Sequence, residues 1–63
     1  MGTAKYIYDN EEDFFKTKNI LIAEILNITP ETLSRILRVF KDEELINTKE
    51  KRINKDGLKA YFS

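Results

Sequence analysis

Four polar residues recur at helical spacing in the middle of the chain, within the segment TPETLSRILRVF. They stand at i, i+3, i+4 and i+7 and are Glu31, Ser34, Arg35 and Arg38. A helix places residues at this spacing along one stripe. The stripe offers a carboxylate that accepts hydrogen bonds, a hydroxyl that donates and accepts them, and two guanidinium groups that donate them. Such a stripe either faces water or recognises the polar surface of a partner.

The composition restricts what other chemistry the chain can carry. Its 63 residues include no Cys and no His, which excludes disulfides, thiolate metal sites and a histidine base. Residues 9–13, DNEED, lack the ligand spacing of a metal-binding loop, and we expect a solvated loop there. The sequence therefore predicts no metal and no other cofactor. With no visible pair of nucleophile and base, an enzyme is the weakest function class.

Charge and hydropathy give a second set of limits. The 11 Lys and Arg residues balance 11 Asp and Glu residues, so the net charge gives no strongly basic signal for nucleic acid. No apolar run approaches the length of a membrane span, and the N-terminus lacks the features of a signal peptide. We therefore expect one small cytoplasmic domain over residues 1–63 that has no membrane partner.

Capping signals place the polar stripe on the second of two helices. The segment KNILIAEILN predicts a first helix that ends at Asn27, because Asn tolerates the left-handed conformation of a tight turn. Thr29 is suited to the N-cap of the next helix and Pro30 to its first position. This helix is expected to end at Glu43 or Glu44. Its core-facing residues lie opposite the polar stripe and are Leu33, Ile36, Leu37 and Phe40.

The flanking segments predict shorter elements. Residues 4–10 read as the end of a short helix, and the aromatic segment 13–17 is either a brief strand or an apolar plug on the core. Residues 45–48 and 52–54 suggest a two-stranded hairpin with a basic tip, followed by a short helix that Asp56 caps. We expect three aromatic residues to lie in the core or at an interface rather than to stack on bases: Tyr6, Tyr61 and Phe62.

The spacing of the two central helices is typical of a helix-turn-helix unit. A small residue, Ala23, is followed at +4 by a turn former, and apolar residues occur at +5, +10 and +13. These positions are Asn27, Ile28, Leu33 and Ile36, and Ile28 is expected to be buried. Each has a physical role, because a small residue lets the helices cross and the apolar residues lock the second helix against the first.

With these residues in place, the segment IAEILNITPETLSRILRVFKDEELI and the basic hairpin NTKEKRIN resemble the winged helix-turn-helix domain of the CRP/FNR family of bacterial transcription regulators. The resemblance covers residues 18–58, and ETLSR is similar to the Glu-x-x-Ser-Arg motif of the FNR-like branch. CRP-like members instead have Arg before the Glu and often Gly in place of the Ser, where this chain has Pro30 and Ser34. Asn27 and Glu44 stand where the family usually has Gly.

The resemblance implies a mainly α fold with a small β-hairpin, a winged helix-turn-helix. It also implies a dimer that reads a pseudo-palindrome in double-stranded DNA, with the second helix in the major groove. The effector-binding domain and the long dimerisation helix of the family have no counterpart in this sequence. We therefore expect a C-terminal fragment that is a monomer alone and a homodimer in its parent protein.

The same resemblance implies site residues. Glu31, Ser34 and Arg35 are expected to contact bases of a TTGA-like half-site. Seven residues are expected to contact phosphates: Thr17, Lys18, Thr29, Arg38, Lys49, Lys51 and Arg52. The alternatives are an ion pair between Arg35 and Glu31, helix capping by the threonines, and solvated basic side chains at the hairpin tip. The alternative function is a winged-helix module that binds protein and not DNA, which would require an exposed apolar patch.

Overall fold

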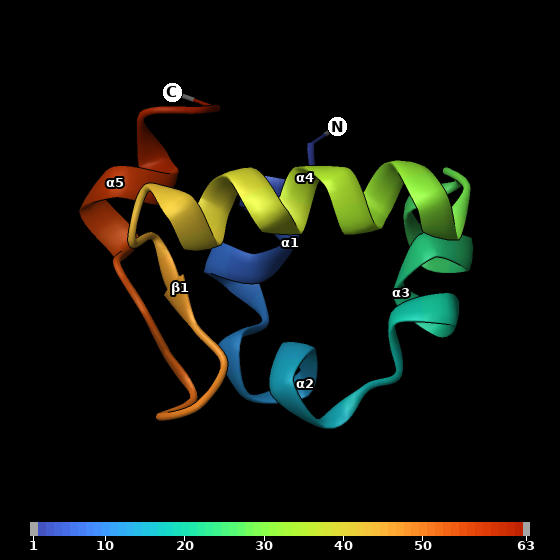
Figure 1. Ribbon diagram of the computed structural model, residues 1–63, viewed down its shortest axis with the longest axis horizontal. Helices are drawn as coiled ribbons and strands as arrows, with labels where there is room; N and C mark the ends of the chain where they lie inside the picture. Colours follow the sequence, from blue (N-terminus) through green and yellow to red (C-terminus); the bar gives the residue numbers. More distant parts are fainter. Residues whose placement is uncertain (1, 63) are drawn as a thin grey trace.

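Five helices and a two-stranded hairpin make up residues 2–62, the part of the chain that the computed structural model describes (Figure 1). In chain order they are α1 (Thr3–Asp9), α2 (Glu11–Lys16), α3 (Asn19–Leu26), α4 (Pro30–Asp42), β1 (Ile46–Asn47), β2 (Arg52–Ile53) and α5 (Lys55–Lys59). The predicted fold, a mainly α winged helix-turn-helix with a small hairpin, is confirmed.

The turn between α3 and α4 has the predicted geometry. Asn27 is left-handed, with φ 57° and ψ 44°, and the N–H of Ile28 reaches back to the carbonyl of Ala23 at 2.9 Å. The hydroxyl oxygen of Thr29 accepts a hydrogen bond from the N–H of Thr32 at 3.1 Å, and Pro30 occupies the first turn of α4. The chain therefore leaves one helix and enters the next within three residues.

The apolar side of α4 is the centre of the core. Leu33, Leu37 and Phe40 are buried, and Ile36 is partly buried against them. Ile28 was predicted to be buried and is also only partly so, because it lies at the turn, at the edge of the core. The largest fully buried side chains come from four different helices and are Ile7, Ile22, Leu33 and Leu58.

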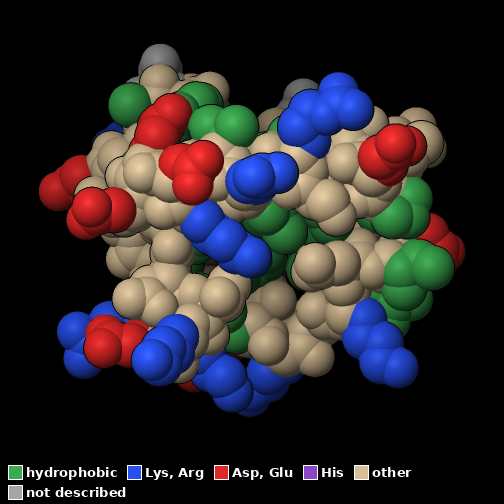
Figure 2. Space-filling model, viewed as in Figure 1, with side chains coloured by type: hydrophobic (Ala, Val, Ile, Leu, Met, Phe, Trp, Pro, Cys, Tyr) green, Lys and Arg blue, Asp and Glu red, His purple; other side chains and the backbone are tan. Residues whose placement is uncertain are grey.

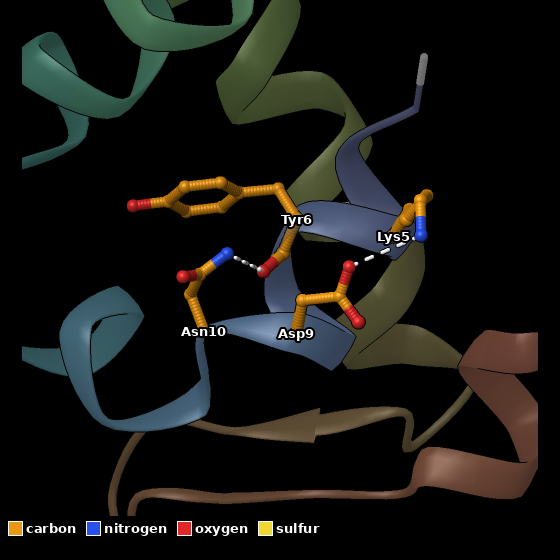
Figure 3. Close-up of polar contacts among 4 residues, drawn as sticks. All are labelled: Lys5, Tyr6, Asp9 and Asn10. Atoms are coloured by element: carbon orange, nitrogen blue, oxygen red, sulfur yellow. Dashed lines mark hydrogen bonds and ion pairs between the residues drawn. The ribbon is translucent and has the colours of Figure 1, made fainter.

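The acidic segment 9–13 is not the loop that we expected. The chain bends at Asn10 between α1 and α2, and the acidic residues Glu11, Glu12 and Asp13 form the first turn of α2. Acidic side chains are favourable there because a helix N-terminus carries partial positive charge. At the bend, the amide nitrogen of Asn10 donates to the carbonyl of Tyr6 at 3.0 Å (Figure 3).

The aromatic segment that follows is helical and apolar rather than a strand. Phe14 is buried in the core, and Phe15 packs against it edge-on with the ring centroids 4.9 Å apart. The alternative of an apolar plug is therefore correct, and the alternative of a brief strand is wrong. With six residues, α2 is too short to show a periodic pattern in the sequence. It can therefore be recognised as a helix only once its buried face is known.

The hairpin is antiparallel, as predicted, with Ile46 opposite Ile53 and Asn47 opposite Arg52. The cap of α5 differs from the prediction, because Asn54 and not Asp56 accepts the hydrogen bond from the N–H of Gly57, at 3.1 Å. Asp56 instead stands in the first turn of α5. A Cβ on Gly57 would clash with the buried side chain of Leu45, which explains a glycine inside this helix.

Glu44 follows the C-cap residue of α4, Glu43, and adopts a left-handed conformation, with φ 59°. The N–H of Glu44 bonds the carbonyl of Lys41 at 3.0 Å, and the N–H of Leu45 bonds that of Phe40 at 2.8 Å. These two bonds close the helix end and turn the chain into β1. The family preference for Gly at this position therefore has a direct conformational reason.

We expect Glu44→Gly to stabilise the domain by about 1 kcal/mol, because Gly removes the steric cost of a left-handed Cβ. Thermal unfolding followed by circular dichroism should show a rise in Tm of about 4–8 °C. Asp42→Gly, two residues earlier in α4, is the matched control and should lower Tm. A fall in Tm for Glu44→Gly would mean that the carboxylate has a stabilising role that outweighs the backbone strain.

Candidate nucleic-acid interface

The predicted polar stripe lies on the exposed side of α4. Glu31, Ser34, Arg35 and Arg38 are all exposed, whereas the opposite side of the same helix is buried. Glu31 stands in the first turn, near the end of the helix that follows the turn residue Asn27. The stripe therefore presents its donors and acceptors to the surroundings and not to the core.

The side chains of the stripe are not paired with one another. Within residues 2–62 the ion pairs are Lys5–Asp9, at 3.1 Å, and Arg52–Glu50, at 3.9 Å. The alternative of an Arg35–Glu31 ion pair is therefore not formed in this structure. Both groups keep their hydrogen-bonding capacity for a partner.

The threonines predicted to contact phosphate act as helix-end residues. The hydroxyl of Thr29 accepts from the N–H of Thr32 and donates to the hydroxyl of Thr32 at 2.8 Å. The hydroxyl of Thr17 donates to the carbonyl of Asp13 at 2.6 Å and so closes α2. Lys18 is exposed at the N-cap position of α3, with no side-chain capping bond.

The basic residues of the hairpin are exposed and surround an ordered tip. The side-chain oxygen of Asn47 accepts from the N–H of Glu50 at 3.0 Å, and Lys51 has a left-handed φ of 56°. The guanidinium of Arg52 points towards the carboxylate of Glu50, although both side chains remain largely exposed. Lys49 and Lys51 take part in neither of the two ion pairs within residues 2–62.

One face of the molecule carries these groups together. Figure 2 shows Lys and Arg side chains over α4, over the hairpin and along the edge formed by α2 and the start of α3. Acidic side chains gather at the C-terminal end of α4 on the same face. The structure thus brings the helix, the hairpin and the α2–α3 connection to one side, although they are up to 35 residues apart in the sequence.

Two features of this surface were missed in the sequence. Lys41 is exposed in the last turn of α4, and its position three residues after Arg38 could have identified it as an extension of the stripe. The outer side of α3 exposes three apolar residues: Ile20, Leu21 and Ile25. The sequence signal for these three residues was that the segment of α3 is apolar on all sides, a pattern typical of a helix that is covered by other parts of a protein.

The other polar features lie outside the stripe. An open groove of about 340 Å³ is lined by acidic residues at the α1–α2 bend together with Tyr8 and Lys55. Within residues 2–62 no group of acidic side chains is placed to hold a metal ion. Tyr61 donates a hydrogen bond to the carboxylate of Glu43, and this bond raises the pKa of the phenol above its usual value.

A comparison with protein families decides the class of the domain. The model of the Crp-like helix-turn-helix domain matches residues 4–61. The chain belongs to this Crp-like family. The match extends the resemblance seen in the sequence, because it includes α1 and α2 as well as the helix-turn-helix and the hairpin.

This Crp-like domain is therefore of the DNA-binding, transcription-regulator type. No match was found among curated proteins or among solved structures. No helix within residues 2–62 has both the length and the apolar character needed to cross a membrane.

Proposed function

We propose that this Crp-like domain binds double-stranded DNA sequence-specifically, with α4 in the major groove. The exposed, unpaired stripe of Glu31, Ser34 and Arg35 carries this proposal. An α-helix fits the major groove, where each base pair presents a distinct pattern of donors and acceptors. The stripe supplies both kinds of group near the end of α4 that follows the turn.

Each residue has a specific role in this proposal. Arg35 donates two hydrogen bonds to O6 and N7 of a guanine, and Glu31 accepts one from the amino group of the paired cytosine. Ser34 contacts a neighbouring thymine or adenine, which gives a TTGA-like half-site. Arg38 and the hairpin lysines Lys49 and Lys51 contact phosphates, which position the domain but carry no sequence information.

Two copies of the domain would read two half-sites about one helical turn apart. The chain alone should bind as a monomer and therefore weakly, with a dissociation constant on the order of 10⁻⁴ to 10⁻⁶ M for non-specific duplex at physiological salt. Dimerisation in a longer protein would raise the affinity, because the second half-site is then bound intramolecularly.

A fluorescence anisotropy titration of the 63-residue chain against a labelled duplex tests this proposal. The affinity should fall as the salt concentration rises from about 0.05 to 0.2 M. Lysine and arginine side chains that bind phosphates release counterions from the DNA, and this release is less favourable at higher salt. The double variant Arg35→Gln/Arg38→Gln should bind more weakly than Lys5→Gln/Lys59→Gln, which removes the same charge from α1 and α5. Equal binding by the two double variants would contradict a role for the α4 stripe.

A second candidate function rests on the apolar side of α3. The exposed fractions of Ile20, Leu21 and Ile25 are 58%, 48% and 55%, and this is the kind of patch that a protein-interaction module requires. The same titration separates the two functions. If no duplex binds even at about 0.05 M salt, the interaction module is favoured and the DNA-binding proposal fails.

A further inference from the structure

A polar groove of about 420 Å³ separates the C-terminal end of α4 from the hairpin. Figure 1 shows β1 running away from this end of the helix. The groove is lined by one buried residue, Ile46, and by five exposed polar ones, which are Lys41, Glu44, Asn47, Thr48 and Lys49. Its walls thus come from two elements that the chain joins by a tight turn.

The lining favours an anion. Two ammonium groups, of Lys41 and Lys49, outnumber the single carboxylate of Glu44. The hydroxyl of Thr48 can donate a hydrogen bond. Asn47 accepts with its side-chain oxygen from Glu50, which leaves its NH₂ group as a further donor.

The C-terminal end of α4 disfavours an anion in the groove less than a helix end with unpaired carbonyls would. A helix C-terminus carries partial negative charge on its unpaired carbonyls and so disfavours anions. Here the carbonyls of Val39, Phe40 and Lys41 each accept a backbone hydrogen bond, at 3.0, 2.8 and 3.0 Å. Among the residues that line the groove, the negative charge comes from Glu44.

The groove also lies where a phosphate would be expected. The major groove is about 12 Å wide and a helix with its side chains about 10–12 Å, so residues at the edge of a docked helix face the DNA backbone. Lys41 is in the last turn of α4, seven residues after Ser34 and three after Arg38, and helical spacing places it on the Ser34 side of the stripe. The hairpin residues Thr48 and Lys49 lie across the groove from it.

We propose that this groove holds a single backbone phosphate of the bound duplex, clamped between Lys41 of α4 and Thr48 and Lys49 of the hairpin. The inference rests on the proposed DNA-binding function and adds Lys41 and Thr48 to its contacts. A clamp from two elements would fix the angle of the hairpin relative to α4 on DNA. Arg35 would then be held in one register against the bases.

The test measures the salt dependence of binding to a duplex of arbitrary sequence. Each phosphate contact contributes about 0.9 to the slope of log affinity against log salt. Loss of one whole contact weakens binding by about 15-fold at 0.05 M and about 4-fold at 0.2 M salt. Lys41→Gln should lower the affinity for all sequences alike by a part of this factor, because Lys49 still holds the shared phosphate. Lys59→Gln is the matched control, because Lys59 is also a basic residue in the last turn of a helix, α5.

The double variant Lys41→Gln/Lys49→Gln tests whether the two lysines share a phosphate. One shared phosphate predicts a slope reduced by about 0.9, whereas two separate phosphates predict about twice that reduction. Thr48→Val should weaken binding with an unchanged slope, and Glu44→Gln should tighten it. The circular dichroism spectra of all variants should match that of the unmodified chain, since every substituted side chain is exposed.

Two outcomes would overturn the proposal. If Lys41→Gln binds as tightly as Lys59→Gln while the unmodified chain shows salt-dependent binding, the clamp is wrong and the DNA-binding function stands. A slope reduced by about 1.8 in the double variant would also overturn it, because the lysines would then contact different phosphates. Absence of salt-dependent binding by the unmodified chain would instead contradict the proposed function itself.

Discussion

Leu33→Ala is expected to unfold this domain or bring it close to unfolding. Leu33 is fully buried in α4, the helix whose inner side forms the centre of the core. Removing a buried leucine side chain costs about 2–5 kcal/mol, from lost transfer energy and from the cavity that remains. A domain of 63 residues has a total stability of only a few kcal/mol. Thermal and urea unfolding, followed by circular dichroism, measure the loss.

Val39→Ala provides the matched control, because Val39 is on the same helix with 44% of its surface exposed. It should change the free energy of unfolding by less than about 1 kcal/mol. An unchanged Tm for Leu33→Ala would show that α4 is held by a different side. The polar stripe would then not face outwards, and the proposed interface would lose its structural basis.

Arg35→Ala is expected to remove the preference for the G·C pair of a TTGA-like half-site. A bidentate contact from arginine to guanine discriminates by about 1–3 kcal/mol, which is about 5-fold to 150-fold in relative affinity. Because the single domain binds weakly, the measurement is best made on the chain dimerised through an added coiled coil, with paired half-sites about one helical turn apart. Competition between TTGA and TTAA duplexes gives the ratio directly.

Lys51→Ala is the contrasting variant, because a hairpin lysine on a phosphate has no base to read. It should weaken binding to both duplexes equally and reduce the salt slope by about 0.9. Glu31→Ala should behave like Arg35→Ala. If Arg35→Ala keeps the TTGA preference of the unmodified chain, the α4 stripe does not read the sequence, and a protein partner for the domain becomes the better hypothesis.

Local signals determined the helix-turn-helix from sequence alone. Asn27, Thr29 and Pro30 each fix their own backbone conformation or cap a helix end, so the turn and the start of α4 follow from residue type. The i, i+3, i+4, i+7 pattern of α4 then determined which side is buried and which is polar. The 13 residues of α4 make more than three turns, which provide enough periodicity for that inference.

The tertiary structure decided the elements that are too short to have a period of their own. Whether residues 13–17 form a strand or a helix depended on how Phe14 reaches the core. The cap of α5 depended on Asn54, whose position follows from its backbone bond to Leu45, at 2.8 Å, across the hairpin base. Such contacts join residues distant in sequence, and no local pattern specifies them.

For the interface, the sequence by itself determined the stripe, its groups and its outward direction. Only the tertiary structure showed that Arg35 is not paired with Glu31, that Lys41 lines a groove with the hairpin, and that basic side chains of α4, of the hairpin and of the α2–α3 edge share one face. The physical reason is that helical spacing fixes the angle of a side chain around its own axis. The distance between α4 and the hairpin depends instead on the packing of the whole core and on the left-handed turn at Glu44.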